Sequence, residues 1–553
     1  MLRRATLFWH APSAHVQPSA TAQPAAPVQP AAPAAARWAA RLLAAGLVLA
    51  TAAGLLMLVE RESLIGDSLG YLHAAQRIAA GFGPTYDDPN NALAGPYFSL
   101  FAFQIQRPDT HLLYLGFPPG LSLLLALPLM FDPSTLLVHW VVPFTALATL
   151  LLSGWLAWLV TQNHWAPVWT MLLLAVTPAL WFFGTAVWSE FPSAAAITGA
   201  SALYLYASGR PHRGWVELVL YGASGLLLAY SVFIRYSNVV VAPVLLLYDG
   251  AALWRQPGKV ARRWPLWLLI GLAVAAIPLF NHVYYGGWNL TSYSPVHGWY
   301  PMPAFSPGYA FGPSFVDGYS FPTGLATLWR NFGLFLLLAP VGWVLLRRTG
   351  ALLAGAALAT FAIYAIYAFA PAGLNARFLI PAMPMLAVGA AVAVVRILER
   401  LPRLPAALLA VALLLLAGLP LPGAVEAAVA RNAGNGQRVA QVRAVAAATP
   451  ADAVFLSYPW NDLLAVYGGR SVFNYRRTLV ADAATRTYRT EQVEPTITAV
   501  VTTLLEEGKP VYFVELESSF LPKLPELLQT NFASETITVA DVTLRKLSLT
   551  AAP

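Results

Sequence analysis

The stretch RESLIGDSLGYLHAAQRIAAGFG, residues 61–83, ends a long apolar run with acids, bases and aromatics. With QRPDTHLLYLGFPPG, residues 106–120, it forms a polar segment in a chain that is only 10% charged, whereas an average soluble domain is about 25% charged. Apolar residues from Tyr71 to Ile78 follow Asp67 at helical spacing, which predicts an amphipathic helix on the membrane surface. Because charge is scarce in this chain, its concentration here marks a candidate functional segment.

The whole chain has the composition of a polytopic integral membrane protein. It contains 553 residues, of which 58% are hydrophobic, and its mean hydropathy is +0.60. There is no cysteine, which excludes disulfides and thiol catalysis. Basic residues beside membrane spans account for the net charge of +8, so nucleic acid is not expected as a partner.

The predicted fold is a polytopic α-helical membrane protein of about 11 transmembrane helices. The segment 116–131 would form only about 24 Å of helix against a hydrocarbon core of about 30 Å, so it is interpreted as an interfacial or re-entrant helix. With a cytoplasmic N-terminus, the basic loops then fall on the cytoplasmic side of the inner (plasma) membrane. The expected spans lie near 38–59, 134–160, 167–185, 191–208, 214–234, 238–253, 264–283, 326–346, 351–370, 378–395 and 404–421.

The domain organisation follows from these spans. Residues 1–36 are predicted to be a disordered cytoplasmic Pro/Ala-rich tail, and 37–425 a transmembrane domain with exterior loops 60–133 and 284–325. Residues 426–553 regain charge and are predicted to form an exterior (periplasmic) soluble α/β domain. This domain could bind the acceptor or brace the exterior loops, and its sequence leaves both roles open.

Details of that domain come from alternating helical and strand patterns. Helices are expected at 437–448 and 496–507, and strands at 453–457, 510–516, 534–539 and 542–549.

The exterior loop 284–325 is rich in aromatic residues, prolines and glycines. Trp299, Tyr300 and Tyr319 are candidate substrate-binding residues, because aromatic rings stack on sugars and lipid chains. An aromatic belt at the membrane interface is the alternative interpretation.

Two arginines lie at exterior ends of spans rather than in basic loops: Arg235 in SVFIRYSN and Arg377 in LNARFLIP. A bare charge at membrane depth is costly, so each must be hydrated, paired or bound to an anion such as a lipid phosphate. Snorkelling, or pairing with Glu190 or an acid of the first loop, is the structural alternative. Asp67 and Glu190 are candidate acids, and N-capping of a helix is the alternative role for each.

Further substrate-binding candidates are Tyr71, His73, Arg77, Asp87 and Asp88, all in the first exterior loop. The histidines have no HxxxH or HxH spacing, so no metal site is predicted. The sequence indicates no particular cofactor, and it leaves open whether the protein uses a divalent cation.

Several short motifs resemble the GT-C superfamily of integral membrane glycosyltransferases, particularly the branch of protein O-mannosyltransferases and lipid A aminoarabinose transferases. The resemblance covers roughly residues 40–400. Its motifs, in order, are GDSLGYLHAAQRIAAGFG (66–83), FPPGLSLLLALPLMF (117–131), WSEFPS (188–193), FIRYSN (233–238) and ARFLIPAMPML (376–386).

The resemblance implies transfer of a sugar from a polyprenyl-phosphate donor to an exterior acceptor that is a lipid, a glycan or a protein. Asp67 then resembles the catalytic aspartate of the first loop, Glu190 a second acid, and Arg235 and Arg377 basic positions near the donor phosphate. Protein mannosyltransferases typically have an Asp-Glu pair where this chain has Asp67 and Ser68, so the resemblance implies sugar transfer rather than protein mannosylation.

Two other functions are weighed against this one. A flippase for lipids or lipid-linked sugars would have polar residues deep inside several spans, and the spans here are largely apolar. A non-catalytic protein that binds a lipid-linked glycan for cell-envelope assembly would keep the same fold and binding residues without turnover.

Overall fold

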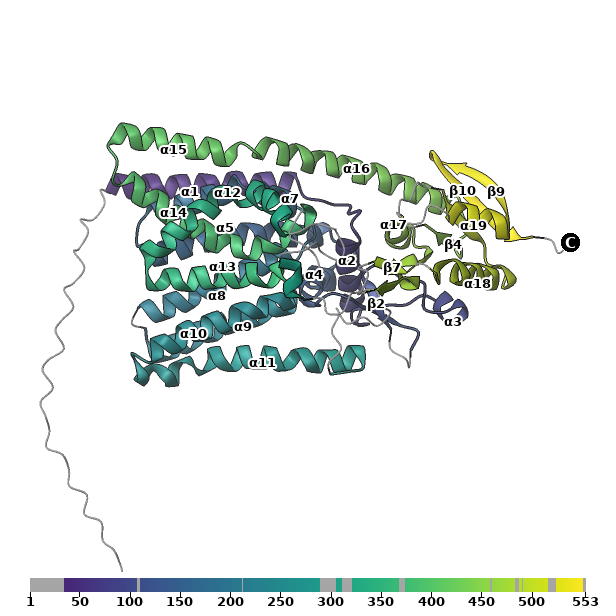
Figure 1. Ribbon diagram of the computed structural model, residues 1–553, viewed down its shortest axis with the longest axis horizontal. Coiled ribbons are helices and arrows are strands. Elements are labelled where there is room, and N and C mark those ends of the chain that lie inside the picture. The colour runs from purple at the N-terminus through teal and green to yellow at the C-terminus, as the bar shows by residue number, and fades with distance from the viewer. Residues whose placement is uncertain are drawn as a thin grey trace, which may run out of the picture.

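The structure is a computed structural model, and it describes residues 34–106, 110–210, 212–288, 305–310, 321–367, 373–457, 460–482, 487–489, 491–515 and 524–550. A helical bundle forms one end of the molecule, and a smaller domain with a β-sheet forms the other (Figure 1). Trp299, Tyr300 and Tyr319 lie outside the described residues, as does most of the 284–325 loop.

Within the described residues, 9 helical segments are long and apolar enough to cross a membrane. They begin with α1 (Ala34–Met57) and include η1 (Leu136–Trp140) joined to α5 (Val141–Thr161), and η2 (Tyr236–Val240) joined to α10 (Val241–Leu253). The others are α9 (Gly214–Ile234), α11 (Val260–Tyr285), α12 (Phe321–Leu346), α13 (Arg348–Ala365), η5 (Gly373–Ala382) with α14 (Met383–Leu398), and α15 (Arg403–Gly418) with α16 (Leu421–Ala447).

The two remaining expected spans also correspond to helices. One is α6 (Trp165–Ala175) followed by α7 (Pro178–Phe183), and the other is α8 (Glu190–Gly209). Most of α8 is buried by its neighbours, and Thr198 and Ser201 hydrogen-bond to carbonyls one turn earlier. A helix enclosed by protein can therefore be less apolar than one that faces lipid. The predicted membrane fold class is confirmed.

The loop after α1 folds into short elements that cap the bundle. It contains α2 (Gly66–Ala79), β1 (Thr85–Tyr86), α3 (Asn90–Ala94), β2 (Phe103–Gln106), β3 (Leu113–Leu115) and α4 (Gly120–Phe131), with strand order β1-β3-β2. The helix α4 has 12 residues, so it is about 18 Å long and too short to cross a bilayer.

The C-terminal domain is reached through α16, which runs along the outside of the molecule from α15 to the sheet (Figure 1). Its sheet has the order β5-β4-β8-β10-β9, in which β4 pairs parallel with β5 and β8, and β10 pairs antiparallel with β8 and β9. Its strands are β4 (Val454–Leu456), β5 (Ser471–Phe473), β8 (Val511–Val514), β9 (Phe532–Val539) and β10 (Val542–Leu549).

Helices α17 (Asn461–Val466), α18 (Val493–Glu506) and α19 (Leu524–Asn531) complete this α/β domain, together with η6 (Tyr475–Thr478) and the β6 (Val480–Asp482) and β7 (Thr487–Arg489) pair. The 3-10 helices η3 (Pro257–Lys259) and η4 (Pro307–Ala310) lie in the membrane domain. The predicted strands after the membrane domain therefore form one sheet.

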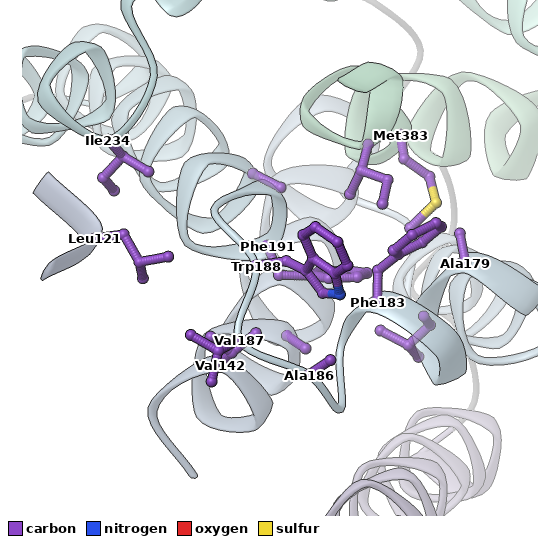
Figure 2. Packing of buried hydrophobic residues seen from close by; sticks show 14 of the residues in the cluster. Leu121, Val142, Ala179, Phe183, Ala186, Val187, Trp188, Phe191, Ile234 and Met383 are labelled. Atoms are coloured by element: carbon purple, nitrogen blue, oxygen red, sulfur yellow. The ribbon is translucent and has the colours of Figure 1, made fainter. Parts of the chain in front are cut away.

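The Phe-Pro-Pro-Gly element places α4 directly on the end of α9. A Cβ built on Gly120 would lie 2.5 Å from the backbone nitrogen of Ile234 and 2.6 Å from the carbonyl oxygen of Phe233. The Tyr230 hydroxyl donates a hydrogen bond to the Gly120 carbonyl at 2.7 Å, and Leu121 and Ile234 belong to the same buried cluster (Figure 2). Glycine at this position lets α4 support the end of α9, where Arg235 follows.

Substituting Gly120→Ala should therefore lower the melting temperature of the detergent-solubilised protein, because the added methyl group overlaps backbone that cannot move freely. The expected cost is about 1–3 kcal/mol. Gly46→Ala in α1 is the matched control, since nothing lies within 4 Å of a Cβ there, and its melting temperature should be unchanged or slightly higher. Equal melting of Gly120→Ala and wild type would contradict the close packing of α4 on α9.

Candidate active site

Four charged side chains from distant parts of the chain meet where the helical bundle adjoins the C-terminal domain. Arg377 Nη2 donates to Asp67 Oδ2 at 2.6 Å, and Arg377 Nε lies 3.5 Å from Glu190 Oε1. The same Glu190 oxygen accepts from Arg235 Nη1 at 2.6 Å. Negative and positive groups therefore alternate from Asp67 to Arg235.

Asp67 lies in the first turn of α2, and its position has no capping function. Ile65 occupies the N-cap of α2, and no side chain caps that end. The side chain of Asp67 is 23% exposed, so one carboxylate can contact both Arg377 and a molecule in solution. The structural alternative of an N-cap therefore does not hold for Asp67.

Gly66 lets the C-terminal domain approach the start of α2. A Cβ on Gly66 would lie 2.5 Å from Asp462 Oδ2. Asp462 Oδ1 in turn accepts from the backbone nitrogen of Phe101 at 2.7 Å. The loop that carries Asp67 is thus held directly against α17.

The guanidinium of Arg377 is fixed by an aromatic ring as well as by the two acids. Its Cζ lies 3.7 Å from the centroid of the Trp188 ring, a cation–π contact. Trp188 is 1% exposed and belongs to a buried cluster with Phe183, Phe191 and Met383 (Figure 2). Arg377 Nη1 is buried and has no hydrogen-bond partner in the described structure, so its capacity to donate is unused.

Arg235 is engaged by the protein itself. Besides Glu190, it donates to Ser189 Oγ at 2.9 Å and to the Tyr364 hydroxyl at 2.8 Å. The Tyr364 hydroxyl also contacts Ser237 Oγ at 2.5 Å. These contacts fix Glu190, which is 1% exposed, between the two guanidinium groups.

A cavity of about 360 Å³ opens beside Asp67 and Arg377. Trp188 lines it on the side of the membrane domain, and Asn461 and Tyr475 line it on the side of the C-terminal domain. Its further lining residues are Leu64, Ile65, Gly66, Phe101, Leu374, Asp462, Leu463 and Asn474. The two domains together therefore enclose the candidate site.

Tyr71 lies one turn after Asp67 in α2. Its ring packs against Phe117 at 5.2 Å between centroids. Burial raises the pKa of Tyr71, although the positive charge of Arg235 opposes the shift. Tyr71 therefore stays protonated beside the charged cluster.

His73 and Arg77 lie further along α2. In the described part of the chain, neither contacts the four charged side chains of the site. The His73 ring packs against Tyr86 and Phe103 at 5.1 and 5.4 Å, and burial lowers the pKa of His73 to about 4. Arg77 lies over the Phe82 ring at 4.3 Å. Both side chains contact the folded loop.

Asp88 joins the first loop to the C-terminal domain. Its Oδ2 accepts from Ser471 Oγ at 2.5 Å, and its Oδ1 accepts from the Asn90 backbone nitrogen at 2.9 Å. Burial raises the pKa of Asp88, and these hydrogen bonds oppose the rise. Asp87 beside it is exposed, and neither residue lines the cavity described above.

Several residues of the site were missed by the sequence reasoning. Trp188 precedes Glu190 in a motif that was noted for its acid, whereas Tyr364 has no sequence signal. Asn461 and Tyr475 lie in a domain without a recognisable motif. No group of three or more His, Asp or Glu able to hold a metal ion occurs among the described residues.

The described architecture is that of a multi-pass membrane protein with a C-terminal α/β domain. At the level of sequence, no protein-family model and no curated protein matches the chain.

The structure of this chain is similar to several solved structures. ArnT from Cupriavidus metallidurans in the apo state is similar with a TM-score of 0.56 and 14% identity, over 93% of this chain and 98% of that chain. The same protein bound to undecaprenyl phosphate is similar with a TM-score of 0.57 and 13% identity, over 93% of this chain and 98% of that chain. The oligosaccharyltransferase AglB from Archaeoglobus fulgidus, with an inhibitory peptide and a dolichol-phosphate, gives 0.54 and 14% over 90% of this chain and 73% of that chain. The fold expected from the motifs is confirmed.

Substituting Glu190→Gln should destabilise the protein by about 3 kcal/mol, because two largely buried guanidinium groups would lose their shared carboxylate. The measurement is the melting temperature in detergent. Glu399→Gln is the control, since the Arg396–Glu399 pair at 3.0 Å is 45% and 40% exposed and such surface pairs contribute little. Equal melting temperatures of the two variants would contradict the central role of Glu190.

Proposed function

We propose that this protein is a membrane glycosyltransferase that transfers a sugar from a polyprenyl-phosphate donor to an acceptor on the exterior face of the inner membrane. In this proposal the N-terminus is cytoplasmic and the C-terminal domain is exterior. The observation that supports it is the pairing of Asp67 with Arg377 at 2.6 Å beside a cavity of about 360 Å³.

The proposed reaction is an inverting displacement at the anomeric carbon of the sugar. The acceptor's nucleophile, a hydroxyl group on a lipid, glycan or protein, loses its proton to the Asp67 carboxylate. A bond forms from the acceptor oxygen to the anomeric carbon while the bond from that carbon to the phosphate oxygen breaks. The polyprenyl phosphate leaves with the bonding electrons.

Arg377 would stabilise the leaving phosphate. Its unpartnered Nη1 is a buried donor, and a positive charge placed where negative charge develops lowers the barrier. Glu190 and Arg235 would act as positioning residues. They bond to each other at 2.6 Å, Glu190 also contacts Arg377, and neither is among the residues that line the cavity. Glu190, a candidate second acid from the sequence, is thus assigned the part of a shared counter-ion.

The solved structures supply a second line of support. ArnT was solved with undecaprenyl phosphate and AglB with a dolichol-phosphate, and both share the fold of this chain. A lipid-linked phosphate is therefore the donor leaving group that the fold and the unpartnered Arg377 donor favour together.

Substituting Asp67→Asn should lower sugar transfer by at least about a hundredfold, because Asn cannot accept the proton, while binding of undecaprenyl phosphate persists. Transfer is measured as release of undecaprenyl phosphate from undecaprenyl-phosphate-linked sugars added to membranes of a deletion strain that carries the variant. The control is Asp541→Asn in the exposed β9–β10 turn, where Asn also tolerates the positive φ of 62°. Donor binding without turnover in the wild type would instead indicate a non-catalytic binding protein.

Substituting Arg377→Gln should weaken undecaprenyl phosphate binding by about tenfold or more, because a charged hydrogen bond to phosphate contributes about 1.5–3 kcal/mol. Binding is measured by thermophoresis of the detergent-solubilised protein. Arg396→Gln, which alters an exposed side chain at the end of α14, is the control. Unchanged binding in Arg377→Gln would remove the assigned phosphate site.

A further inference from the structure

The wall of the cavity supplied by the C-terminal domain carries four polar side chains that the proposed reaction does not use. Two of them, Asp462 and Asn474, are engaged by hydrogen bonds to the first loop, which leaves Asn461 and Tyr475. Asn461 is the first residue of α17, and Tyr475 is the first residue of η6. Both line the cavity that also exposes Asp67 and Arg377. Their residues are 8% and 1% exposed, respectively, so both are nine-tenths or more buried.

Each of these side chains carries a buried polar atom that lacks a partner. Asn461 Oδ1 and the Tyr475 hydroxyl have no hydrogen-bond partner in the described structure. The other end of the Asn461 amide donates to the Ser99 carbonyl at 3.2 Å, which fixes the orientation of the group. A buried polar atom without a partner costs about 1–3 kcal/mol, so a ligand that supplies the missing bonds would be bound favourably.

The backbone around Tyr475 holds its ring in place. The neighbouring Asn474 donates to Ser99 Oγ at 3.0 Å, and its backbone nitrogen donates to the Tyr97 carbonyl at 2.8 Å. The Tyr475 ring packs edge-on against Phe473 at 5.1 Å between centroids. The hydroxyl therefore belongs to a rigid wall.

The opposite wall has a different chemistry. Arg377 Nη1 and Trp188 Nε1 are both donors without a hydrogen-bond partner in the described structure, and both residues line the cavity. Donors beside a guanidinium suit an anionic oxygen. Asn461 and Tyr475 are neutral and supply one acceptor and one hydroxyl, which suits an uncharged hydroxyl-bearing group.

We infer that Asn461 and Tyr475 bind hydroxyl groups of the sugar carried by the donor, so that the C-terminal domain helps to select the sugar. This inference rests on the proposed function. A single cavity of about 360 Å³ contains the phosphate-type donors and the neutral groups, so one small molecule with a phosphate and a polyol ring can meet both walls. Asn461 Oδ1 accepts a hydrogen bond from one sugar hydroxyl, and the Tyr475 hydroxyl donates to another oxygen of the ring.

Apolar residues of the cavity lining fit the same occupant. Phe101 and Leu463 line the cavity, and the face of a sugar ring that carries C–H groups packs on such surfaces. A sugar would therefore meet polar groups around its edge and apolar groups across one face, the usual arrangement in small-molecule sites.

The test compares two kinds of probe on the full-length protein in detergent. One is undecaprenyl phosphate, and the other is undecaprenyl phosphate that carries glucose, mannose or N-acetylglucosamine. Wild type should bind at least one glycosylated probe more tightly than the sugar-free lipid. The margin is the ratio of the affinity for the glycosylated probe to the affinity for the sugar-free lipid. Tyr475→Phe, which removes one oxygen atom, should reduce this margin by about fivefold, the value of one hydrogen bond. Binding of the sugar-free lipid should stay unchanged.

Controls separate a binding role from a structural one. Tyr512→Phe alters another buried tyrosine of the same domain, which stacks on Phe455 at 5.5 Å, and it should leave the margin unchanged. The melting temperature of Tyr475→Phe should equal that of wild type, because the hydroxyl has no protein partner in the described structure. Asn461→Ala should reduce the margin as well, and Tyr475→Phe remains decisive if Asn461→Ala does not fold.

The outcomes distinguish the two proposals. Equal binding of glycosylated and sugar-free probes by wild type, or an unchanged margin in Tyr475→Phe, would overturn the sugar contact while leaving the phosphate site in place. Failure of wild type to bind any undecaprenyl phosphate probe would overturn the proposed function itself, and the inference with it.

Discussion

The placement of Glu190 between two arginines is the constraint on which the site depends. Its Oε1 contacts Arg235 at 2.6 Å and Arg377 at 3.5 Å, and the side chain is 1% exposed. Without this carboxylate two positive charges would repel each other in a region of low dielectric. With it, Arg235 is occupied by the protein, and Arg377 keeps a free donor beside Asp67. The acid therefore determines which of the two cations can meet a ligand.

The C-terminal domain extends this arrangement, since it both braces the first loop and encloses the cavity. Asp88 bonds to Ser471 at 2.5 Å, and Asp462 bonds to the backbone of Phe101 at 2.7 Å. These contacts support the bracing role that the sequence left open for this domain, and the bracing residues are neighbours in the chain of those that line the cavity. Binding of the acceptor, the other role, stays a prediction.

The membrane fold could be predicted from the sequence because span length and loop charge are local properties. The candidate acids and bases could be found because charge is scarce at membrane depth. The partnership of Asp67 with Arg377 could not be derived, since they are 310 residues apart in the chain and their distance depends on the packing of many helices. Tyr475 and Asn461 were missed because neutral residues in a soluble domain are common and carry no motif.

The helix α16 has a geometric consequence for the cavity. It spans Leu421–Ala447 and connects the last membrane-spanning helix to the sheet. The direction in which the sheet faces therefore depends on the number of residues in this helix. Each inserted residue would turn the sheet by about 100° and shift it by about 1.5 Å along the helix axis. Only insertions near whole numbers of turns would therefore keep the C-terminal wall of the cavity facing the charged residues of the helical bundle, and each such insertion would move that wall away from them.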